Sequence, residues 1–474
     1  TVLAFDFGAS SGRAIRAVYD GQNLTYEEIH RFENVPIEKG GHLFWDVETL
    51  LKEIHTAIQK AGTFDSLGFD TWGVDFGLLD TDGHLLANPV HYRDARTNGK
   101  PEQAAACMPA EELYAHTGNQ IMAINTLFQL LALQEQEPEL LQKAEQILFM
   151  PDLFAALLGA EPVCERSIAS TSQMLDPRTG QWSREVLTAY GLKENHFAPL
   201  VASGTVTGTL TTGAKIIAVA GHDTQCASAA MPCAEEDAEH TAFLSCGTWS
   251  LLGTELDAPI LTADSCQSGL SNELGANGKI NYLKNIIGLW LIQESRREYK
   301  RRGQAYSFAQ QALAAEPLRT FIDPDAPEFV APGDLPGRIQ EFCRKTGQPV
   351  PETVGAVMRC IYESLALKYR YAIEQLSAVT GRAFTTLHVL GGGTKDRLLC
   401  QMTADCCGLT VKAGPVEATA LGNIMIQLKA LGLLDSITQG RRLIAETEVI
   451  KTYTASTQNY AEWNAAYDRF KTLL

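Results

Sequence analysis

Two segments far apart in this chain share one pattern: an apolar strand, a tight turn of Gly, Ser and Thr, and a second strand. The first is Phe5-Asp6-Phe7-Gly8-Ala9-Ser10-Ser11-Gly12, and the second centres on Ser245-Cys246-Gly247-Thr248. We interpret the second as an internal duplication of the first. At 474 residues the chain also exceeds the roughly 250–300 residues at which a single core stops growing. We therefore predict two domains, residues 1–233 and 234–474.

The first half of the chain predicts an α/β domain. Strands at residues 2–5, 14–19 and 24–32 form an antiparallel meander. Asp46 is a suitable N-cap for a helix whose apolar residues recur at helical spacing from Val47 to Ile58. Further patterns predict a strand at 67–69, helices at 126–134 and 144–158, and a strand at 216–220.

The second half begins after an acidic stretch at Glu235-Glu236-Asp237. It predicts a long amphipathic helix at 357–376, a strand at 387–390, a helix at 397–407, a strand at 409–412 and a helix at 417–431. The C-terminal end carries no pattern that we can interpret. We expect two α/β lobes that face each other.

Composition excludes several classes of protein. The formal net charge of −17 repels nucleic acid and anionic lipid, and no apolar run approaches the ~18 residues of a membrane span. The N-terminal apolar residues are followed directly by Asp6 and are typical of a strand, not of a secretory signal, so we expect a cytoplasmic protein. We further expect a monomer or a small homo-oligomer. The eleven cysteines form no Cys-x-x-Cys pair and are interpreted as buried free thiols, with Cys343 and Cys360 left open as a pair.

The first turn has the residue types that a phosphate group needs. Ala9, Ser10, Ser11 and Gly12 place backbone N–H groups and hydroxyls around one point, and Arg13 adds a positive charge. Asp6, at the end of the preceding strand, is placed to hold Mg²⁺ through water. The alternative is an ordinary glycine-rich hairpin with a solvated acid.

The duplicated turn, Gly247-Thr248, gives a second candidate grip on a polyphosphate. We interpret the neighbouring Trp249 as a core aromatic residue. A third glycine-rich segment, Gly391-Gly392-Gly393, follows a predicted buried strand; it either lets a nucleotide approach the backbone or is a plain flexible turn. The common dinucleotide and P-loop fingerprints are absent from the sequence.

The segment Gly221-His222-Asp223-Thr224 follows a predicted apolar strand and precedes a helix of small residues. An acid in this position is commonly a helix N-cap. At the end of a strand in a cleft, Asp223 would instead serve as a catalytic base that orients a sugar hydroxyl and accepts its proton late. Both interpretations stay open at this point.

In their order and separation, these four segments resemble the FGGY carbohydrate kinases, and the resemblance covers nearly the whole chain. It implies an α/β fold of two ribonuclease H-like domains of the actin and hexokinase type, facing a central cleft. It implies that ATP phosphates bind the first turn and Gly247-Thr248, that Gly391, Gly392 and Gly393 lie against adenosine, and that Asp223 is the catalytic base.

Most members of that family carry Asp-x-Gly-Thr followed by Ser or Thr in the first turn, whereas this chain has Gly8-Ala9-Ser10-Ser11-Gly12-Arg13. That departure is similar to the members that phosphorylate L-rhamnulose. So are six further segments: Asp70-Thr71-Trp72-Gly73-Val74-Asp75-Phe76, Tyr92-Arg93-Asp94-Ala95-Arg96-Thr97, Gly221-His222-Asp223-Thr224, Leu244-Ser245-Cys246-Gly247-Thr248-Trp249-Ser250-Leu251, Lys284-Asn285-Ile286-Ile287-Gly288-Leu289-Trp290, and Gly414-Pro415-Val416-Glu417-Ala418-Thr419.

By that resemblance the sugar contacts Gly73, His222, Asp223 and Thr224 and lies near Asn285. Gln293 and Gly392 line the nucleotide site, and Asp6 and Asp223 hold Mg²⁺ through water. The implied reaction is the ATP-dependent phosphorylation of L-rhamnulose at O1, in L-rhamnose catabolism.

Polar residues at predicted strand ends fit a polyol ligand, which needs donors and acceptors arranged around it. They are Asp70, Asp75, Arg93, Asp94, Arg96 and His222. For Asp75 and Arg96, hairpin or salt-bridge chemistry is an equal alternative. The competing functions are a kinase for another ketose or polyol (L-fuculose, xylulose, glycerol), an actin- or chaperone-like ATPase, and a sugar-binding pseudoenzyme.

Overall fold

The computed structural model describes residues 1–304 and 307–474 and has the predicted α/β character. The chain forms two compact units. Unit 1 contains Thr1–Pro232, Glu255–Tyr282 and Ala418–Thr447, and unit 2 contains Cys233–Thr254, Leu283–Glu417 and Glu448–Leu474. Each compact unit is therefore made of three separate segments of the chain. The division into two contiguous domains, residues 1–233 and 234–474, stays a prediction.

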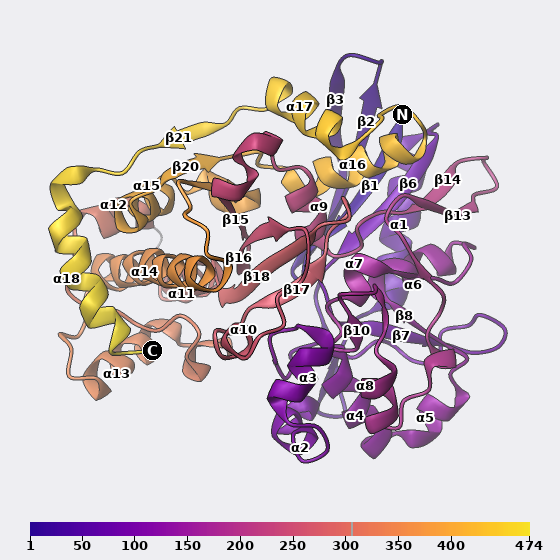
Figure 1. The fold of residues 1–474 in the computed structure, drawn as a ribbon, viewed down its shortest axis with the longest axis horizontal. Helices are drawn as coiled ribbons and strands as arrows, with labels where there is room; N and C mark the ends of the chain where they lie inside the picture. Colours follow the sequence, from indigo (N-terminus) through magenta and orange to yellow (C-terminus); the bar gives the residue numbers. More distant parts are fainter. Residues whose placement is uncertain (305–306) are drawn as a thin grey trace. The chain divides into compact units, whose positions relative to one another are not determined.

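Unit 1 is built around a sheet of six strands in the order β13-β14-β6-β1-β2-β3 (Figure 1). The strands of unit 1, inside and outside this sheet, are β1 (Val2–Phe7), β2 (Ser11–Tyr19), β3 (Leu24–Glu33), β4 (Ile37–Lys39), β5 (His42–Phe44), β6 (Ser66–Thr71), β7 (Phe76–Leu79), β8 (Gln146–Phe149), β9 (Cys164–Glu165), β10 (Leu175–Asp176), β11 (Gln181–Trp182), β12 (Leu200–Val201), β13 (Thr205–Thr209), β14 (Lys215–Ala218) and β17 (Ser271–Leu274). Its helices are α1 (Val47–Ala61), α2 (Lys100–Ala104), α3 (Ala110–Thr117), α4 (Thr126–Gln136), α5 (Pro138–Lys143), α6 (Met150–Leu157), α7 (Arg166–Ala169), α8 (Arg184–Ala189), α9 (Asp223–Ala229), α10 (Ala263–Gln267), α16 (Ala418–Ala430) and α17 (Ile437–Thr447).

The predicted meander is confirmed, because β1 pairs antiparallel with β2 and β2 antiparallel with β3. β6 runs parallel to β1 on its other side. Alternation along β1 gives the sheet two apolar faces: Leu3, Phe5 and Phe7 pack with α1 and α6, whereas Val2 and Ala4 pack with α9, α16 and α17. Asp46 caps α1 as predicted, accepting a hydrogen bond from the Thr49 amide.

Helix α16 belongs to unit 1 although it follows most of unit 2 in the sequence. It lies against β1 and β6 and packs closely on α9 (Figure 1). A Cβ atom at Gly422 would stand 1.9 Å from the Cys226 carbonyl oxygen, so only glycine permits this approach. Asn423 and Gln427 donate hydrogen bonds to the carbonyl oxygens of Gly68 and Leu3, which attaches the helix to the sheet.

One predicted helix is wrong in part. Residues 144–158 do not form a single helix, because Gln146–Phe149 forms β8, which pairs antiparallel with β7. Only Met150–Leu157, with a proline in its first turn, is helical. The apolar Ile147-Leu148-Phe149 run fits either structure locally, and pairing with β7 decides for a strand.

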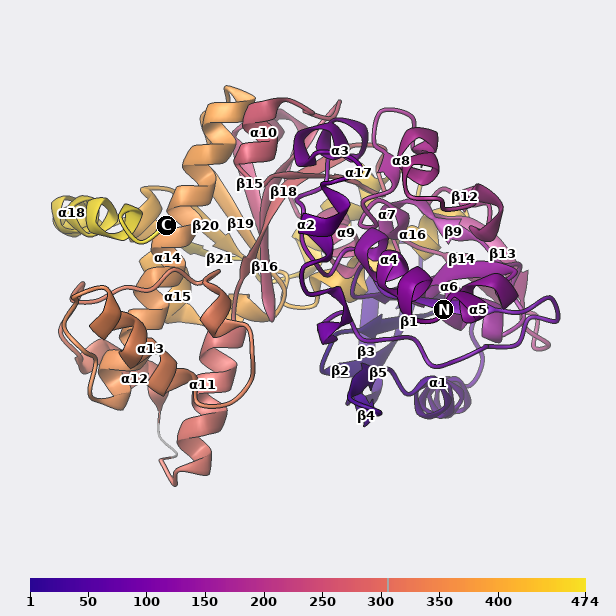
Figure 2. The ribbon, with the colours of Figure 1, turned by 90° about the horizontal axis from the view of Figure 1, so that it is seen from below.

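Unit 2 contains the strands β15 (Thr241–Cys246), β16 (Trp249–Leu256), β18 (Ile280–Ile287), β19 (Thr386–Leu390), β20 (Thr410–Ala413) and β21 (Lys451–Tyr453); the chain passes to or from unit 1 within β16 and β18. Its helices are α11 (Trp290–Arg301), α12 (Phe308–Ala314), α13 (Leu335–Lys345), α14 (Val354–Thr380), α15 (Arg397–Cys407) and α18 (Tyr460–Lys471). The long helix α14 packs against α11, α12, α13, α15 and α18 (Figure 2).

The predicted duplication is visible in the strand pairing. β15 lies between an antiparallel neighbour, β16, and a parallel neighbour, β19, as β1 lies between β2 and β6. In both units, therefore, a glycine-containing turn connects the central strand to its antiparallel neighbour. The C-terminal end, for which the sequence gave no prediction, forms α17 in unit 1 and β21 and α18 in unit 2.

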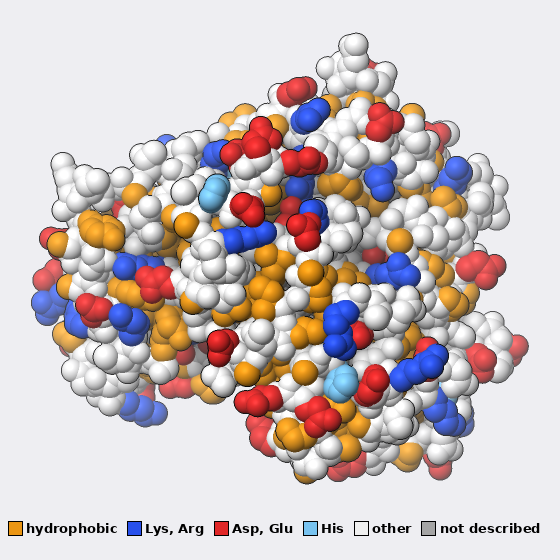
Figure 3. All heavy atoms as spheres, viewed as in Figure 1, with side chains coloured by type: hydrophobic (Ala, Val, Ile, Leu, Met, Phe, Trp, Pro, Cys, Tyr) orange, Lys and Arg blue, Asp and Glu red, His pale blue; other side chains and the backbone are white. Residues whose placement is uncertain are grey.

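The structure shows where the charged side chains and the cysteines lie. Acidic and basic side chains are interspersed on the face shown in Figure 3. None of the eleven cysteines forms a disulfide bond, and Cys343 and Cys360 are both buried. Within the described ranges, none of the helices combines the length and apolarity that a bilayer span requires.

Candidate active site

Two acids meet where β1 and β6 end. Asp6 and Asp70 are directly opposite in the parallel register of these strands. Both side chains are on the α16 face of the sheet, with exposed fractions of 8% and 0%. Arg13, opposite Asp6 in the antiparallel register, donates hydrogen bonds from Nε (3.0 Å) and Nη2 (2.6 Å) to Asp6 Oδ2. The guanidinium thus balances one of the two acids.

Asp70 is the less satisfied of the two. Its Oδ2 accepts a 2.7 Å hydrogen bond from Asn423, whereas its buried Oδ1 has no hydrogen-bond partner. Burial raises the pKa of Asp70 well above its usual value, and the charges of Asp6 and Asp223 raise it further. Three carboxylates therefore act on one another here.

Asp223 is not the N-cap of α9. His222 occupies that position, and Asp223 is the first residue of the helix, with its Oδ1 accepting a 2.6 Å hydrogen bond from the Thr224 amide. Its side chain remains 33% exposed. Burial raises the pKa of Asp223 to about 6; His222 opposes this rise and Asp6 adds to it. Asp223 thus keeps a carboxylate oriented toward solvent beside Asp6 and Asp70.

His222 is fixed from both sides. Its Nδ1 lies 2.8 Å from Glu273 Oε2, and its Nε2 lies 3.4 Å from Asp223 Oδ1. Burial lowers the pKa of His222, but the charge and hydrogen bond of Glu273 outweigh it and the pKa is raised overall. Gln225 donates a second hydrogen bond (2.6 Å) to the same Glu273 oxygen.

The loop before His222 is held by a buried acid. Glu165 Oε2 accepts hydrogen bonds from the Gly221 amide (3.0 Å), from Ser167 and from the Ile168 amide, and its Oε1 accepts one from Ser203. Four donor residues on one carboxylate make it a rigid anchor. It fixes the position from which His222 and Asp223 leave the sheet.

Gly73 approaches His222 and Thr171 closely. A Cβ atom at this position would lie 3.4 Å from His222 Nε2 and 3.3 Å from the Thr171 side chain. The next residue, Val74, has φ +67°, which is strained for a β-branched residue. Thr171 Oγ1 accepts a hydrogen bond from its amide, and Thr126 Oγ1 donates one to its carbonyl. Strain held by such contacts is typical of functional loops.

Asp75 is a structural residue. It is fully buried. Its Oδ2 accepts hydrogen bonds from the indole N–H groups of Trp45 (2.6 Å) and Trp72 (2.9 Å) and from the Tyr92 amide (3.1 Å). Its Oδ1 accepts a hydrogen bond from the Gln129 side chain (2.8 Å). Burial raises its pKa to about 6 against these hydrogen bonds. Since all four donors come from the protein, the hairpin interpretation is favoured over sugar binding.

The first turn presents unused donors. The Gly8 amide donates to the Ser11 carbonyl, and the Asn34 side chain donates to the Gly8 carbonyl. Among the described residues, the amides of Ala9 and Ser10 have no hydrogen-bond acceptor. Gly12 lies in β2 beneath the Phe32 ring, which a Cβ atom would meet at 2.3 Å.

The second turn is braced within unit 2. The carbonyl oxygen of Thr248 accepts hydrogen bonds from the Gly288 and Trp290 amides, and that of Gly247 accepts one from the Leu289 amide. Ser250, just after the turn, bonds to the Tyr369 hydroxyl of α14 at 2.7 Å. The turn is therefore attached to the start of α11 and to the long helix.

The three consecutive glycines differ in their surroundings. Gly393 is required by packing, because a Cβ atom there would overlap Cys246 Sγ at 2.2 Å. Gly391 is favoured by its backbone conformation, because its φ is +79°. Gly392 is exposed, with no atom within 4 Å of an added Cβ. Gln293 is exposed on α11, and Asn285 is half-buried on β18. An open backbone face at Gly392 fits the approach of a flat ligand.

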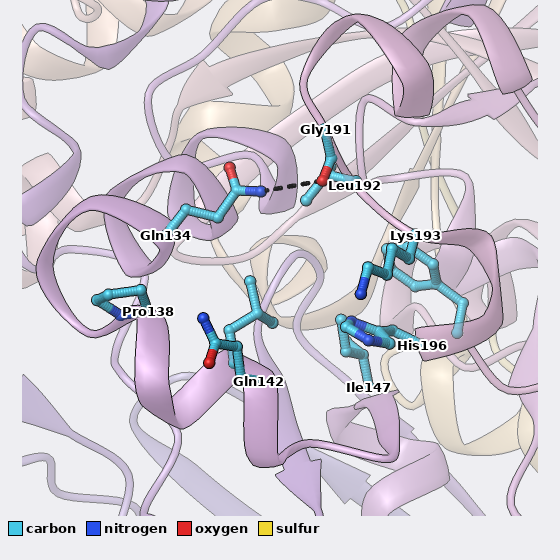
Figure 4. A pocket seen from close by; sticks show the side chains of 10 residues that line it. Gln134, Pro138, Gln142, Ile147, Gly191, Leu192, Lys193 and His196 are labelled. Atoms are coloured by element: carbon cyan, nitrogen blue, oxygen red, sulfur yellow. Dashed lines mark hydrogen bonds between the residues drawn. The ribbon is translucent and has the colours of Figure 1, made fainter.

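A separate hollow of about 380 Å³ lies in unit 1, between α4, α5 and the segment around Lys193 (Figure 4). Its lining residues are Gln134, Pro138, Leu141, Gln142, Ile147, Gly191, Leu192, Lys193, His196 and Phe197. None of the predicted site residues is among them. This hollow does not define the candidate site.

Several residues of the site escaped sequence analysis. Glu165 and Glu273 read as exposed acids in short strands, and nothing in the local pattern marks them as buried. Asn423 and Gln427 carry a weak signal, because two amides at i and i+4 interrupt an otherwise apolar helix. Thr171 has no distinguishing feature in the sequence.

The family of this chain follows from comparison with known proteins. The N-terminal domain of the FGGY family of carbohydrate kinases matches residues 1–229, and the C-terminal domain of the same family matches residues 242–431. The chain belongs to the FGGY family of carbohydrate kinases. Kinase activity implies ATP as the phosphoryl donor.

Curated relatives match over nearly the full chain. A rhamnulokinase of Bacteroides thetaiotaomicron is 43% identical over 99% of this chain and 98% of the relative. Rhamnulokinases of Enterococcus faecalis (41%; 96% of this chain, 94% of the relative) and Enterobacter sp. (39%; 98% and 97%) are also similar.

Solved structures confirm the fold. A ligand-bound xylulose kinase from Lactobacillus acidophilus matches with a TM-score of 0.81 at 16% identity, covering 100% of this chain and 97% of that one. Plasmodium falciparum glycerol kinase with ADP matches with a TM-score of 0.76 at 14% identity, covering 99% and 97%. The predicted actin- and hexokinase-like fold class is confirmed.

Replacing Asp75 with Ala should lower the free energy of unfolding by about 2–5 kcal/mol, because two indoles, an amide and a carboxamide lose their acceptor. Urea denaturation followed by tryptophan fluorescence measures the change. Asp82→Ala, in an exposed turn, is the control and should shift stability by less than about 0.5 kcal/mol. Equal stability of the two variants would contradict the structural role.

Proposed function

We propose that this kinase transfers the γ-phosphoryl group of ATP to O1 of L-rhamnulose. The observation that carries the proposal is the group formed by Asp223, His222 and Gly73: a carboxylate beside an oriented imidazole, next to the glycine that would border the sugar slot. Full-length similarity to three rhamnulokinases supports this sugar. An actin-like ATPase has no use for a base beside a sugar slot.

In the proposed mechanism, Asp223 orients the attacking hydroxyl and accepts its proton as the bond to phosphorus forms. Its pKa of about 6 keeps it ionised at neutral pH. His222 and Thr224 contact the sugar, Gly73 leaves room for it, and Asn285 lies near it. The free amides of Ala9 and Ser10, with Ser11, Gly12 and Arg13, bind phosphate oxygens.

The second turn and the glycine segment complete the proposed nucleotide contacts. Gly247 and Thr248 bind phosphate oxygens, Gly391, Gly392 and Gly393 receive the adenosine, and Gln293 lines the same site. The exposed backbone of Gly392 supports this assignment, since an unhindered peptide plane accepts a flat ring.

The acids of unit 1 fit a hard divalent cation. Asp6 and Asp223 offer carboxylate oxygens, and the unpartnered Oδ1 of the buried Asp70 indicates a local excess of acceptors. We propose that Asp6 and Asp223 hold Mg²⁺ through water. When bound, the ion neutralises charge on the transferring phosphoryl group.

The proposed substrate is tested by comparing kcat/KM over a sugar panel with a coupled assay for ADP release. L-rhamnulose should exceed L-fuculose, xylulose and glycerol by at least about 100-fold, because a site built to bond particular hydroxyls rejects ligands that lack them. A higher kcat/KM for another acceptor would reassign the substrate. ADP release without any dependence on sugar would contradict the kinase mechanism.

Asp223→Asn should lower kcat by roughly 10²–10⁴, the usual effect of losing a positioned base, while the thermal midpoint changes little. Because the pKa of Asp223 is raised to about 6, its basic form is lost as pH falls through that value. Wild-type kcat/KM for ATP should therefore decline below about pH 6, where an ordinary aspartate would hold it to about pH 4.

Asp82→Asn is the matched control for this prediction, because it makes the same chemical change in an exposed turn outside the site. It should leave kcat and the acid limb of the pH profile unchanged. A turnover of Asp223→Asn above a third of the wild-type value would reject Asp223 as the base.

Removing divalent cations should abolish turnover. With excess chelator, ADP release should fall to background, and added Mg²⁺ or Mn²⁺ should restore it, because a chain of net charge −17 has no excess positive charge to balance a triphosphate. Circular dichroism in the same buffers checks that the fold survives. Full activity in chelator would contradict the proposed metal site.

A further inference from the structure

Glu273 is a buried acid in contact with His222. It lies on β17, within the Glu255–Tyr282 segment of unit 1, with an exposed fraction of 4%. Its Oε2 accepts two hydrogen bonds, from His222 Nδ1 (2.8 Å) and from Gln225 Nε2 (2.6 Å). Among the described residues, His222 is its only ion-pair partner.

The contact fixes which nitrogen of His222 carries hydrogen. A carboxylate oxygen only accepts, so Nδ1 must be protonated, and Nε2 is the ring nitrogen left to contact other groups. Nε2 lies 3.4 Å from Asp223 Oδ1 and 3.4 Å from the position of a Cβ atom at Gly73. The same nitrogen therefore borders both the proposed base and the proposed sugar slot.

Glu273 is itself held by a chain of amides. Gln225 donates to Glu273, and Asn281 Nδ2 donates to the Gln225 side-chain oxygen and to Ser228 Oγ (2.7 Å). All four residues are buried. A carboxylate in such a network cannot turn away from the imidazole without leaving donors unsatisfied, so the ring orientation is rigid.

We propose that Glu273 is a positioning residue for sugar recognition, which acts by holding the His222 ring with Nε2 directed at the sugar. The proposal rests on the proposed function, because it takes the slot beside Gly73 and His222 as the sugar site. The ligand class is a ketose with a hydroxyl group in reach of Nε2. A cyclic polyol lacking that hydroxyl gains nothing from Glu273.

Two variants separate positioning from general stability. Glu273→Ala removes the acceptor and should raise KM for L-rhamnulose about 10- to 100-fold, the loss expected for one charge-assisted hydrogen bond. KM for ATP should stay within about twofold. Glu273→Gln keeps an oxygen that can accept from Nδ1 and Gln225, so it should restore KM for the sugar to within about threefold of wild type.

Glu255→Gln is the matched control, since Glu255 is a half-buried acid of the same segment that pairs with Arg441 at 2.7 Å. It should lower the thermal midpoint without changing either KM. If Glu273→Ala leaves KM for the sugar unchanged, or raises KM for the sugar and KM for ATP together, the positioning role is refuted.

The ring itself provides a readout independent of turnover. In ¹⁵N-histidine-labelled protein, His222 should be protonated at Nδ1, and Glu273→Ala should shift it to the Nε2–H tautomer that imidazole prefers in water. A wild-type ring protonated only at Nε2 would overturn the proposal. Absence of wild-type activity on L-rhamnulose would instead overturn the proposed function and leave this ring measurement valid.

Discussion

The site of unit 1 depends on the mutual repulsion of three carboxylates, Asp6, Asp70 and Asp223. Placing like charges together in a partly buried region is unfavourable unless other groups compensate. Arg13 compensates Asp6, Asn423 supports Asp70, and His222 lies beside Asp223. Burial raises the pKa values of Asp70 and Asp223, and the charges of the neighbouring carboxylates raise them further.

The fold brings these acids together through strand geometry. Parallel strands β1 and β6 end at the same edge, and an isolated bridge from Thr71 to His222 brings the start of α9 to that edge. The surrounding supports come from remote parts of the chain: Glu165 from β9, Glu273 from β17 and Asn423 from α16. Segments that follow parts of unit 2 in the sequence thus complete the site of unit 1.

Sequence analysis predicted the elements with strong periodicity, including the meander, α1, α14, α15 and the duplicated turn. It was wrong where tertiary pairing decides, as at β8. At Asp223 it left an N-cap and a catalytic base as alternatives, and the structure places His222 at the N-cap position. It identified the residues that end strands, but it missed Glu273, Glu165 and Asn423. Their function arises from partners 50 or more residues away, a separation that one sequence does not encode legibly.

If this carboxylate cluster serves phosphoryl transfer to a sugar, the products formed from ATP and L-rhamnulose will show it in a nuclear magnetic resonance spectrum. We expect one phosphate monoester, with ³¹P coupled to the C1 methylene protons, formed in equal amount with ADP. Inorganic phosphate as the main product, with no sugar ester, would rule out phosphoryl transfer to the sugar and indicate an ATPase.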